Sequence, residues 1–294
     1  MKCFLCDYQG EMQIKSSVEN RNIFKCPNCS VQFMHPQTSE EELNQIYSNE
    51  NYPTCSFDKG FENEIIKMKR KTFNNILNKV ISYCKGGNIL DIGCSSGILL
   101  EEAKLLGFNP YGIEISEYAS SIAKKRIGED KIYNGSLENA PFKKNDFNLI
   151  TMIDIIEHVR NPIDALLKAR EYLNITTNSN GGGYCMITTP NTNSFTCKIM
   201  GSKWAHYNLE HIHYFNINSI KKIAEITGFE ILEIKPYFKI LTIKYMNYIF
   251  KYNKRKFLSF IFSILEKIPI LCNLQIPILA GEFLIILRKK GEII

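Results

Sequence analysis

Seven residues in the first half of the chain combine an acid, two glycines and several small side chains. They run from Asp91 to Gly97 as Asp-Ile-Gly-Cys-Ser-Ser-Gly and follow an apolar stretch that ends at Leu90. Glycine permits backbone dihedrals and close approaches that a side chain would prevent, and the N–H groups at the start of a helix are free to donate to a ligand. The stretch therefore suits either a tight structural turn or a loop that holds a ligand against the backbone.

The absence of known phosphate-binding patterns limits which ligands the loop could bind. A dinucleotide-binding loop would have glycine where this chain has Ser95 and Ile98, and no phosphate-binding GxxxxGK[ST] pattern occurs. Glu114 ends the next predicted strand, where a carboxylate can accept hydrogen bonds from both hydroxyls of a ribose. An acid at a strand end is also commonly a solvated terminus or a helix cap. Taken together, the loop and the acid favour a ligand that has a ribose and lacks a phosphate tail.

A third polar group follows the strand predicted over 147–154. Asp154, Glu157 and His158 leave the carboxyl end of this strand and are expected at the same edge of the sheet. An imidazole with an ordinary pKa of ~6.5 can remove a proton near neutral pH, and Glu157 can orient it or bind substrate hydroxyls. His158 is therefore predicted as a general base. A purely structural role for Glu157 and His158, as a buttress of the glycine loop, stays open.

A cluster of aromatic, histidine and acidic residues lies between Trp204 and Tyr214. It contains His206, His211 and His213 within eight residues. Three interpretations stay open: a segment that contacts the substrate, a second metal site, and simple packing. Of these residues, His211 is predicted to contact the substrate pocket.

Four of the ten cysteines have a spacing that is typical of metal ligands. Cys3 and Cys6 form one CxxC pair and Cys26 and Cys29 a second, with 19 residues between the pairs. Four thiolates in this arrangement can bind one zinc ion tetrahedrally. Without an export signal a reducing compartment is expected, which favours thiols or metal ligands over disulfides. We therefore predict a structural zinc site, and the other six cysteines receive no role.

Length and composition predict one main domain with an appendage. The chain has 294 residues, of which 45% are hydrophobic and 22% charged, enough to bury a full core. From residue 88 onward, short apolar strands alternate with helical stretches, which predicts a parallel sheet with helices on both faces. The start of the chain has no signal-peptide pattern, and no apolar run reaches the ~18 residues that span a bilayer. A cytoplasmic protein is expected.

Three parts are expected along the chain. Residues 1–36 form the cysteine module, 37–87 a helical linker or cap, and 88–294 the main domain with an insertion over 239–278. The insertion has seven Lys or Arg and one acid, so it accounts for the whole net charge of +6. Apolar residues at helical spacing beside these cations are typical of a peripheral helix on a membrane surface, and equally of a helix packed on its own domain. Both interpretations stay open.

Residues 88–290 resemble a class I S-adenosylmethionine-dependent methyltransferase. The matching motifs are ILDIGCSSG, GIEIS, APFKKNDFNLITMIDIIEHVRNP, ITTPN and the stretch that begins at Trp204. The cysteine module followed by EEELNQIY is similar to the zinc-ribbon-bearing branch of that family, of small-molecule or sugar type. The resemblance implies an α/β fold with a doubly wound, mostly parallel seven-stranded sheet of the Rossmann-like methyltransferase type and a small N-terminal zinc knuckle.

The resemblance also implies which residues bind the cofactor S-adenosylmethionine. The glycine loop would line its methionine and ribose end, the acid after the second strand would hold the ribose hydroxyls, and two residues after the third strand would border the adenine. The implied cofactor contacts are Asp91, Gly93, Cys94, Gly97, Glu114, Ile115, Ser136, Leu137 and Asp154.

The expected activity is methyl transfer to a hydroxyl of a small polar acceptor. A nucleotide- or lipid-linked sugar of surface glycan biosynthesis is the first choice, with His158, Glu157 and His211 in the chemistry and Zn²⁺ in a structural role. Two alternatives stay open: a zinc-bearing RNA methyltransferase and a non-catalytic methyltransferase-like binding protein. Residues 1–36 hold four Lys or Arg against three acids and lack a basic aromatic face, so no nucleic-acid partner is expected.

Overall fold

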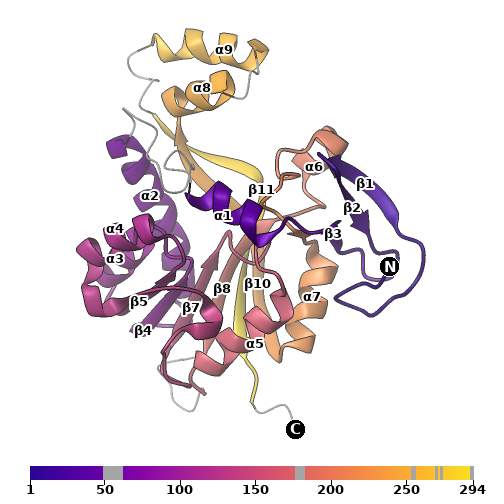
Figure 1. Ribbon diagram of the computed structural model, residues 1–294. Helices are drawn as coiled ribbons and strands as arrows, with labels where there is room; N and C mark the ends of the chain where they lie inside the picture. Colours follow the sequence, from indigo (N-terminus) through magenta and orange to yellow (C-terminus); the bar gives the residue numbers. More distant parts are fainter. Residues whose placement is uncertain (49–61, 176–182, 253–255, 269–270, 272–273, 292–294) are drawn as a thin grey trace.

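The computed structural model describes residues 1–48, 62–175, 183–252, 256–268, 271 and 274–291. Parts of the predicted linker and of the predicted insertion lie outside these ranges. The described residues form a seven-stranded sheet and a separate four-stranded sheet (Figure 1). The strand order of the larger sheet is β10-β11-β8-β7-β4-β5-β6.

Five parallel strands form the part of the larger sheet that was expected from the alternating pattern. β4 pairs in parallel with both β5 and β7, β6 extends the sheet beyond β5, and β8 extends it beyond β7. The strand order therefore reverses at β4, as in a doubly wound sheet. The strands are β4 (Gly87–Ile92), β5 (Phe108–Glu114), β6 (Ile132–Asn134), β7 (Leu149–Ile153) and β8 (Tyr184–Pro190). The carboxyl ends of these strands therefore share one edge, and the predicted fold class is confirmed.

Two long antiparallel strands complete the sheet. β10 (Phe229–Thr242) pairs with β11 (Gln275–Lys289), and β11 also pairs with β8. Alternate residues of β11 face opposite sides of the sheet, which explains its continuous apolar run. The insertion predicted over 239–278 begins and ends within these strands, so its helical part is shorter than the composition indicated.

Helices cover both faces of the larger sheet (Figure 1). One face packs against α2 (Glu62–Val80), α3 (Ile98–Leu105) and α4 (Glu117–Ile127). The other packs against α5 (Pro162–Tyr172) and α7 (Ile217–Ile226). Since α2 shares a buried core with the sheet, the segment predicted as a linker or cap contributes directly to the packing of the main domain.

The smaller sheet joins the cysteine module to the main domain. It contains β1 (Gln13–Val18), β2 (Arg21–Lys25) and β3 (Gln32–His35) from the cysteine module, and β9 (His213–Tyr214) from the main domain. The short helix α1 (Glu40–Ser48) follows and begins with a capping box, in which Ser39 and Glu42 exchange side-chain to backbone hydrogen bonds. The cysteine module is thus attached to the main domain by strand pairing.

A helical pair connects β10 to β11 and projects from the body of the molecule (Figure 1). It consists of α8 (Ile243–Tyr252) and α9 (Lys256–Glu266), which pack against each other. Within the described ranges, no helix is both long enough and apolar enough to cross a membrane.

Candidate functional site

The glycine loop leaves β4 in a conformation that its residue types require. Gly93 and Gly97 have φ angles of 76° and 77°, and Ser95 has 48°. A Cβ atom on Gly93 would lie 2.1 Å from Cδ1 of Ile155, and with a positive φ any side chain at this position would be strained. The N–H groups of Gly93 and Cys94 donate to the carbonyl oxygen of Ile113 at 2.8 and 3.0 Å. The loop therefore folds back over the end of β5.

Two buried acids lie beneath this loop. Glu114 accepts hydrogen bonds from the N–H groups of Ser95 at 2.7 Å and Ser116 at 2.8 Å. Asp91 accepts a hydrogen bond of 2.6 Å from the Thr151 hydroxyl. Burial raises the pKa of Asp91 to about 7 and also raises the pKa of Glu114. Neither carboxylate forms an ion pair with a described Lys or Arg, so this site favours a ligand that supplies hydroxyl donors or positive charge.

The remaining predicted cofactor contacts lie at the same sheet edge. Ile115 follows β5 and is 61% exposed, which leaves an apolar side chain available to a flat ring. Ser136 and Leu137 follow β6 at the start of a short 3₁₀ helix, and Leu137 is buried. The Cys94 thiol instead points into the core, where a Cβ on Gly112 would meet its sulfur at 2.6 Å. Only the backbone of Cys94 remains to line a ligand.

Asp154 is held in a network with two residues that sequence reasoning missed. Lys239 Nζ lies 3.0 Å from Asp154 Oδ2 and 2.6 Å from Glu282 Oε1. Thr188 donates its hydroxyl to Asp154 Oδ1 at 2.7 Å. Burial by itself would raise the pKa of Asp154, but Lys239 and Thr188 hold that pKa below its ordinary value. This network forms a charged wall next to the predicted catalytic residues.

A β-bulge explains how Lys239 reaches this wall. Tyr237 pairs with Glu282, whereas Lys239 pairs with Ile278, so β11 has extra residues between these two pairs. Such a bulge bends a strand and redirects its side chains. In the sequence, Lys239 looked like the first residue of a basic insertion. Lys239 lies two residues after Tyr237 on the same strand, and this spacing would have assigned it to β10 rather than to the insertion. The spacing is informative only once β10 is known to extend to residue 239.

Glu157, His158 and His211 come together at the exit of β7, as predicted for the chemistry. Their donor atoms all lie within 4.8 Å of one another, and the rings of His158 and His211 are 4.7 Å apart. Glu157 is 1% exposed, and neither of its carboxylate oxygens has a hydrogen-bond partner among the described residues. Two imidazoles and one carboxylate can transfer protons, and this set of donors keeps the alternative of a metal site open.

Burial sets the protonation states in this cluster. It lowers the pKa of His158 to about 4 and the pKa of His211 well below the ordinary value. It raises the pKa of Glu157 well above its ordinary value, with a further contribution from the charge of Asp154. Both imidazoles are therefore neutral near pH 7, and a neutral imidazole is the form that can accept a proton.

The cysteine module holds the segment that carries His211 in place. The N–H groups of Ile212 and His213 donate to the Glu157 carbonyl at 2.9 and 3.1 Å. From the module, Met34 N–H donates to the Ile212 carbonyl at 2.9 Å, and just after the module the Thr38 hydroxyl donates to the Leu209 carbonyl at 2.6 Å. His211 thus lies in a wall packed between the module and β7. Closure of this segment over an acceptor stays a prediction.

The four predicted zinc ligands converge at one end of the module. The sulfur atoms of Cys3 and Cys29 are 3.6 Å apart, as are those of Cys6 and Cys26, and all four lie within 4.8 Å of one another. Zn–S bonds of about 2.3 Å in a tetrahedron place sulfurs about 3.8 Å apart, whereas a disulfide would bring them to about 2 Å. The geometry therefore fits a zinc ion and does not fit disulfides.

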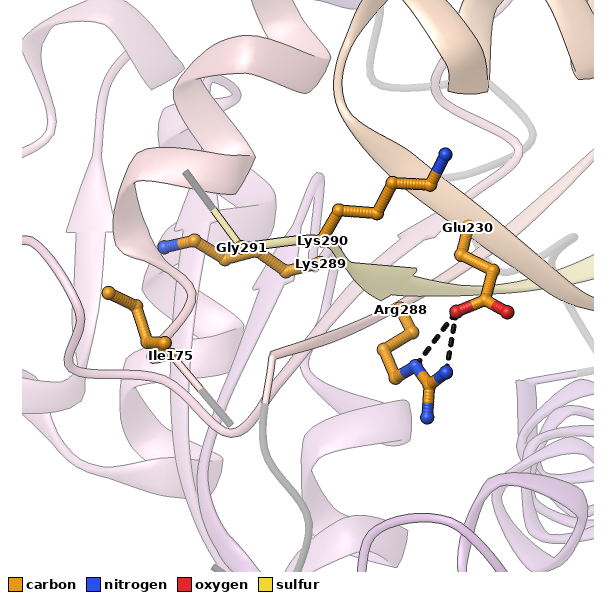
Figure 2. A pocket seen from close by; sticks show the side chains of 6 residues that line it. All are labelled: Ile175, Glu230, Arg288, Lys289, Lys290 and Gly291. Carbon is orange, nitrogen blue, oxygen red and sulfur yellow. Dashed lines mark hydrogen bonds and ion pairs between the residues drawn. The ribbon is translucent and has the colours of Figure 1, made fainter. Parts of the chain in front are cut away.

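A surface pocket at the opposite edge of the sheet is separate from these clusters (Figure 2). It has a volume of about 370 Å³ and lies where β10 begins and β11 ends. Its most ordered feature is the ion pair of Arg288 with Glu230 at 2.6 Å. In doubly wound folds, ligands bind at the carboxyl ends of the parallel strands, so we do not assign this pocket to the site.

Comparison with known proteins decides the family. The methyltransferase domain family matches residues 68–234, which is more than half of the chain. The chain belongs to this methyltransferase family. The methyltransferase is 35% identical over 92 residues to a ubiquinone biosynthesis O-methyltransferase of Schizosaccharomyces pombe, a match that covers 29% of this chain and 34% of that protein. It is 23% identical over 199 residues to one of Cereibacter sphaeroides, covering 66% of this chain and 73% of that protein.

The fold of the methyltransferase is shared with solved structures. A S-adenosylmethionine-dependent methyltransferase from Thermotoga maritima superimposes with a TM-score of 0.54 at 18% identity, covering 84% of this chain and all of that one. The likeness confirms the class I methyltransferase fold. The chain spans 34%, 48% and 51% of the length of the first three curated relatives.

The residues of this methyltransferase fit the cofactor of its family, S-adenosylmethionine. Its ribose offers two hydroxyl donors, and its methionine end carries an ammonium and a sulfonium. Glu114 uses one lone pair on each oxygen for backbone N–H groups and keeps acceptor capacity for the ribose. Asp91 is a buried carboxylate without a described cation nearby, which a positive methionine end would neutralise. The roles of the individual residues stay predictions.

Proposed function

We propose that the protein transfers a methyl group from S-adenosylmethionine to a hydroxyl oxygen of a small acceptor. The observation that carries this proposal is the neutral imidazole of His158 beside the buried carboxyl group of Glu157, at the sheet edge that also holds Asp91 and Glu114. A hydroxyl is a weak nucleophile, so a positioned base that removes its proton is the feature that O-methylation requires.

In this proposal His158, Glu157 and His211 have different roles in the reaction. When bound, the cofactor supplies an electrophilic methyl group on a sulfonium. His158 accepts the hydroxyl proton while the oxygen bonds to the methyl carbon and the carbon–sulfur bond breaks, which yields a methyl ether and S-adenosylhomocysteine. Glu157 lies beside this imidazole and orients it, and His211 holds the acceptor against His158. Alignment of these groups supplies much of the rate enhancement, because the displacement has to be in line.

The charged wall shapes the acceptor end of the site. Lys239 lies between Asp154 and Glu282, and Glu282 is only 3% exposed as a side chain. His206 Nε2 lies 3.9 Å from the same Glu282 oxygen, and burial lowers the pKa of this histidine to about 4. Lys239 contacts both carboxylates, so the network can fix the position of the exit of β7, while Oε2 of Glu282 has no hydrogen-bond partner among the described residues.

The names of the curated relatives and the resemblance stated in the sequence analysis support different classes of acceptor. The relatives described above are named as ubiquinone biosynthesis O-methyltransferases, which supports an oxygen acceptor and points to a hydroxyl on a ring. A sugar linked to a nucleotide or lipid was expected from the resemblance, and none of these relatives is named for a sugar. We therefore propose an aromatic hydroxyl first, with a sugar hydroxyl as the second class to be tested.

We also propose one structural zinc ion on Cys3, Cys6, Cys26 and Cys29. Its support is the sulfur geometry and the hydrogen bonds by which the cysteine module holds the His211 segment. In this proposal the ion does not touch the substrates; it keeps the module folded so that the module can support the site.

Calorimetric titration with S-adenosylhomocysteine tests the cofactor site. We expect binding to the wild-type protein and a loss of affinity of at least about 100-fold in Glu114→Ala, because two hydrogen bonds to a charged group are removed. Glu117→Ala is the matched control, since Glu117 is exposed three residues further along. Absence of binding to the folded wild type, or equal affinities of both variants, would contradict the assignment of the cofactor site.

Transfer of a labelled methyl group tests the acceptor class. The protein is incubated with methyl-tritiated S-adenosylmethionine and either catechols and other phenols, nucleotide sugars, or total RNA. Label in the phenols supports the first proposal, and label in the sugars supports the second class. Label in RNA, accompanied by strongly salt-dependent RNA binding, would instead support the alternative of an RNA methyltransferase. Cofactor binding with no product from any class would favour a binding protein.

A further inference from the structure

The helical pair α8 and α9 presents an apolar face to solvent. On α9 and the turn after it, Phe257 is 76% exposed, Phe260 66% and Ile264 51%, and Ile261 and Ile268 are exposed as well. These positions recur at intervals of three, four and seven residues, so they form one stripe along a helix. None of the residues of α9 is buried. A stripe of large apolar side chains at this exposure marks a surface that binds something.

The opposite side of α9 is already occupied by α8. The rings of Phe250 and Phe262 are 5.0 Å apart, and Asn247 donates to the Ser263 hydroxyl at 3.2 Å. Asn247 also donates to the carboxylate of Glu266, which turns the one acid of this region inward. The pair therefore has its own internal packing, and the exposed stripe is not needed to hold the two helices together.

The base of the helical pair is firmly attached to the body. β10 and β11 remain paired up to Thr242, which directly precedes α8, and Gln275, which begins β11. α2 anchors this end, because the N–H of Ile240 donates to the Thr72 hydroxyl at 2.8 Å and Thr242 hydrogen-bonds to Glu64. The exposed stripe is thus presented at a fixed position, away from the body of the molecule (Figure 1).

The positive charge around the apolar stripe of α9 indicates which kind of partner it binds. Residues 243–274 contain six Lys or Arg and one acid, and Lys251, Lys256 and Lys267 are exposed on the two helices or the turn after them. A second copy of the pair would carry the same positive surplus, so two such faces would repel each other. Apolar side chains flanked by cations match a bilayer that has anionic headgroups above acyl chains.

We propose that the apolar stripe of α9 docks on the surface of an anionic phospholipid membrane. The helix lies in the plane of the interface, with Phe257, Phe260 and Ile264 among the acyl chains and the lysines among the headgroups. The attraction of each cation to such a surface and the burial of the phenylalanines both favour binding. The proposal is independent of the acceptor class proposed above.

Vesicle flotation of the full chain tests this proposal. We expect binding to phosphatidylcholine vesicles that contain about 30% phosphatidylglycerol, weaker binding to phosphatidylcholine alone, and a decline as salt is raised. The double variant Phe257→Glu with Phe260→Glu should bind at least tenfold more weakly. Phe195→Glu is the matched control, because Phe195 is 75% exposed on the separate helix α6 (Phe195–Met200) and should leave binding unchanged.

Two further measurements keep the test decisive. The double variant should bind S-adenosylhomocysteine with the wild-type affinity, which shows that it is folded and that the cofactor site is separate. Absence of wild-type binding to anionic vesicles would overturn the proposal. A wild-type dimer in sedimentation that the double variant abolishes, without vesicle binding, would show instead that the stripe is an interface between copies of this chain.

Discussion

Replacement of His158 by alanine is expected to lower kcat for methyl transfer about 10²- to 10⁴-fold, the usual contribution of a positioned general base. The affinity for S-adenosylhomocysteine should stay unchanged, because the proposed cofactor ligands Asp91 and Glu114 belong to β4 and β5, whereas His158 follows β7. The measurement is a steady-state assay with labelled S-adenosylmethionine and the acceptor found in the transfer experiment. His35→Ala is the control, since His35 is exposed on the cysteine module.

The pH profile separates catalysis by His158 from a structural role. Burial lowers the pKa of His158 to about 4, so its neutral, proton-accepting form persists at pH 5 to 8 and is lost only as the pH falls toward 4. The acidic limb of kcat/KM should therefore lie well below the ~6.5 of an ordinary imidazole. Added imidazole should partly restore activity to His158→Ala. A variant that loses cofactor affinity and activity together, without rescue, would show that His158 only supports the loop.

Loss of zinc is the second change with a large expected effect. Cys26→Ser, or removal of zinc by a chelator, should unfold the cysteine module, because structural zinc contributes about 10–16 kcal/mol to the folding of small zinc modules. Methyl transfer should fall to background, since the segment with His211 loses the hydrogen bonds from Met34 and Thr38. Cofactor binding should survive, because Asp91 and Glu114 lie in the larger sheet. Elemental analysis and calorimetry on the same samples measure these effects.

Cys84→Ala is the matched control for this experiment. Cys84 is a buried free thiol in the core of the main domain, distant from the knuckle sequence, and should leave one zinc per chain. A second equivalent of metal that disappears in His211→Ala would support the metal alternative for the cluster at the exit of β7. Purified protein that is folded and active without any zinc would refute the structural zinc site.

The fold was predictable because its signals are local. Alternating apolar strands and helices, the glycine loop and the acid after the second strand all lie within short windows, and each window matches one element of the sheet. The spacing of Cys3, Cys6, Cys26 and Cys29 is local in the same sense, and the structure brings the four sulfurs together. Residues 239–242 and 275–278 of the predicted insertion belong to β10 and β11, because these strands extend through residues whose composition resembles that of the helices between them.

The candidate site was predictable only in part, for a physical reason. Glu157 and His158 share one stretch of six residues, whereas Lys239 and Glu282 meet Asp154 through a bulge between two strands that are distant in sequence. A bulge is a property of strand pairing, and no pattern within β10 or β11 alone indicates it. The attachment of the cysteine module to β9 was missed for the same reason, because pairing partners cannot be read from either segment.

The pairing of β3 with β9 also constrains how the chain is built on the ribosome. The four proposed zinc ligands lie between residues 3 and 29, far ahead of β9 in the chain, so the nascent chain can close this loop before β9 is synthesised. The edge of β3 stays open much longer, because its partners His213 and Tyr214 are among the later residues to be synthesised. An open strand edge is a template for association with other chains. Synthesis that stops before Tyr214 would release a fragment that has a closed cysteine loop and an unprotected strand edge, and this fragment would be prone to aggregate.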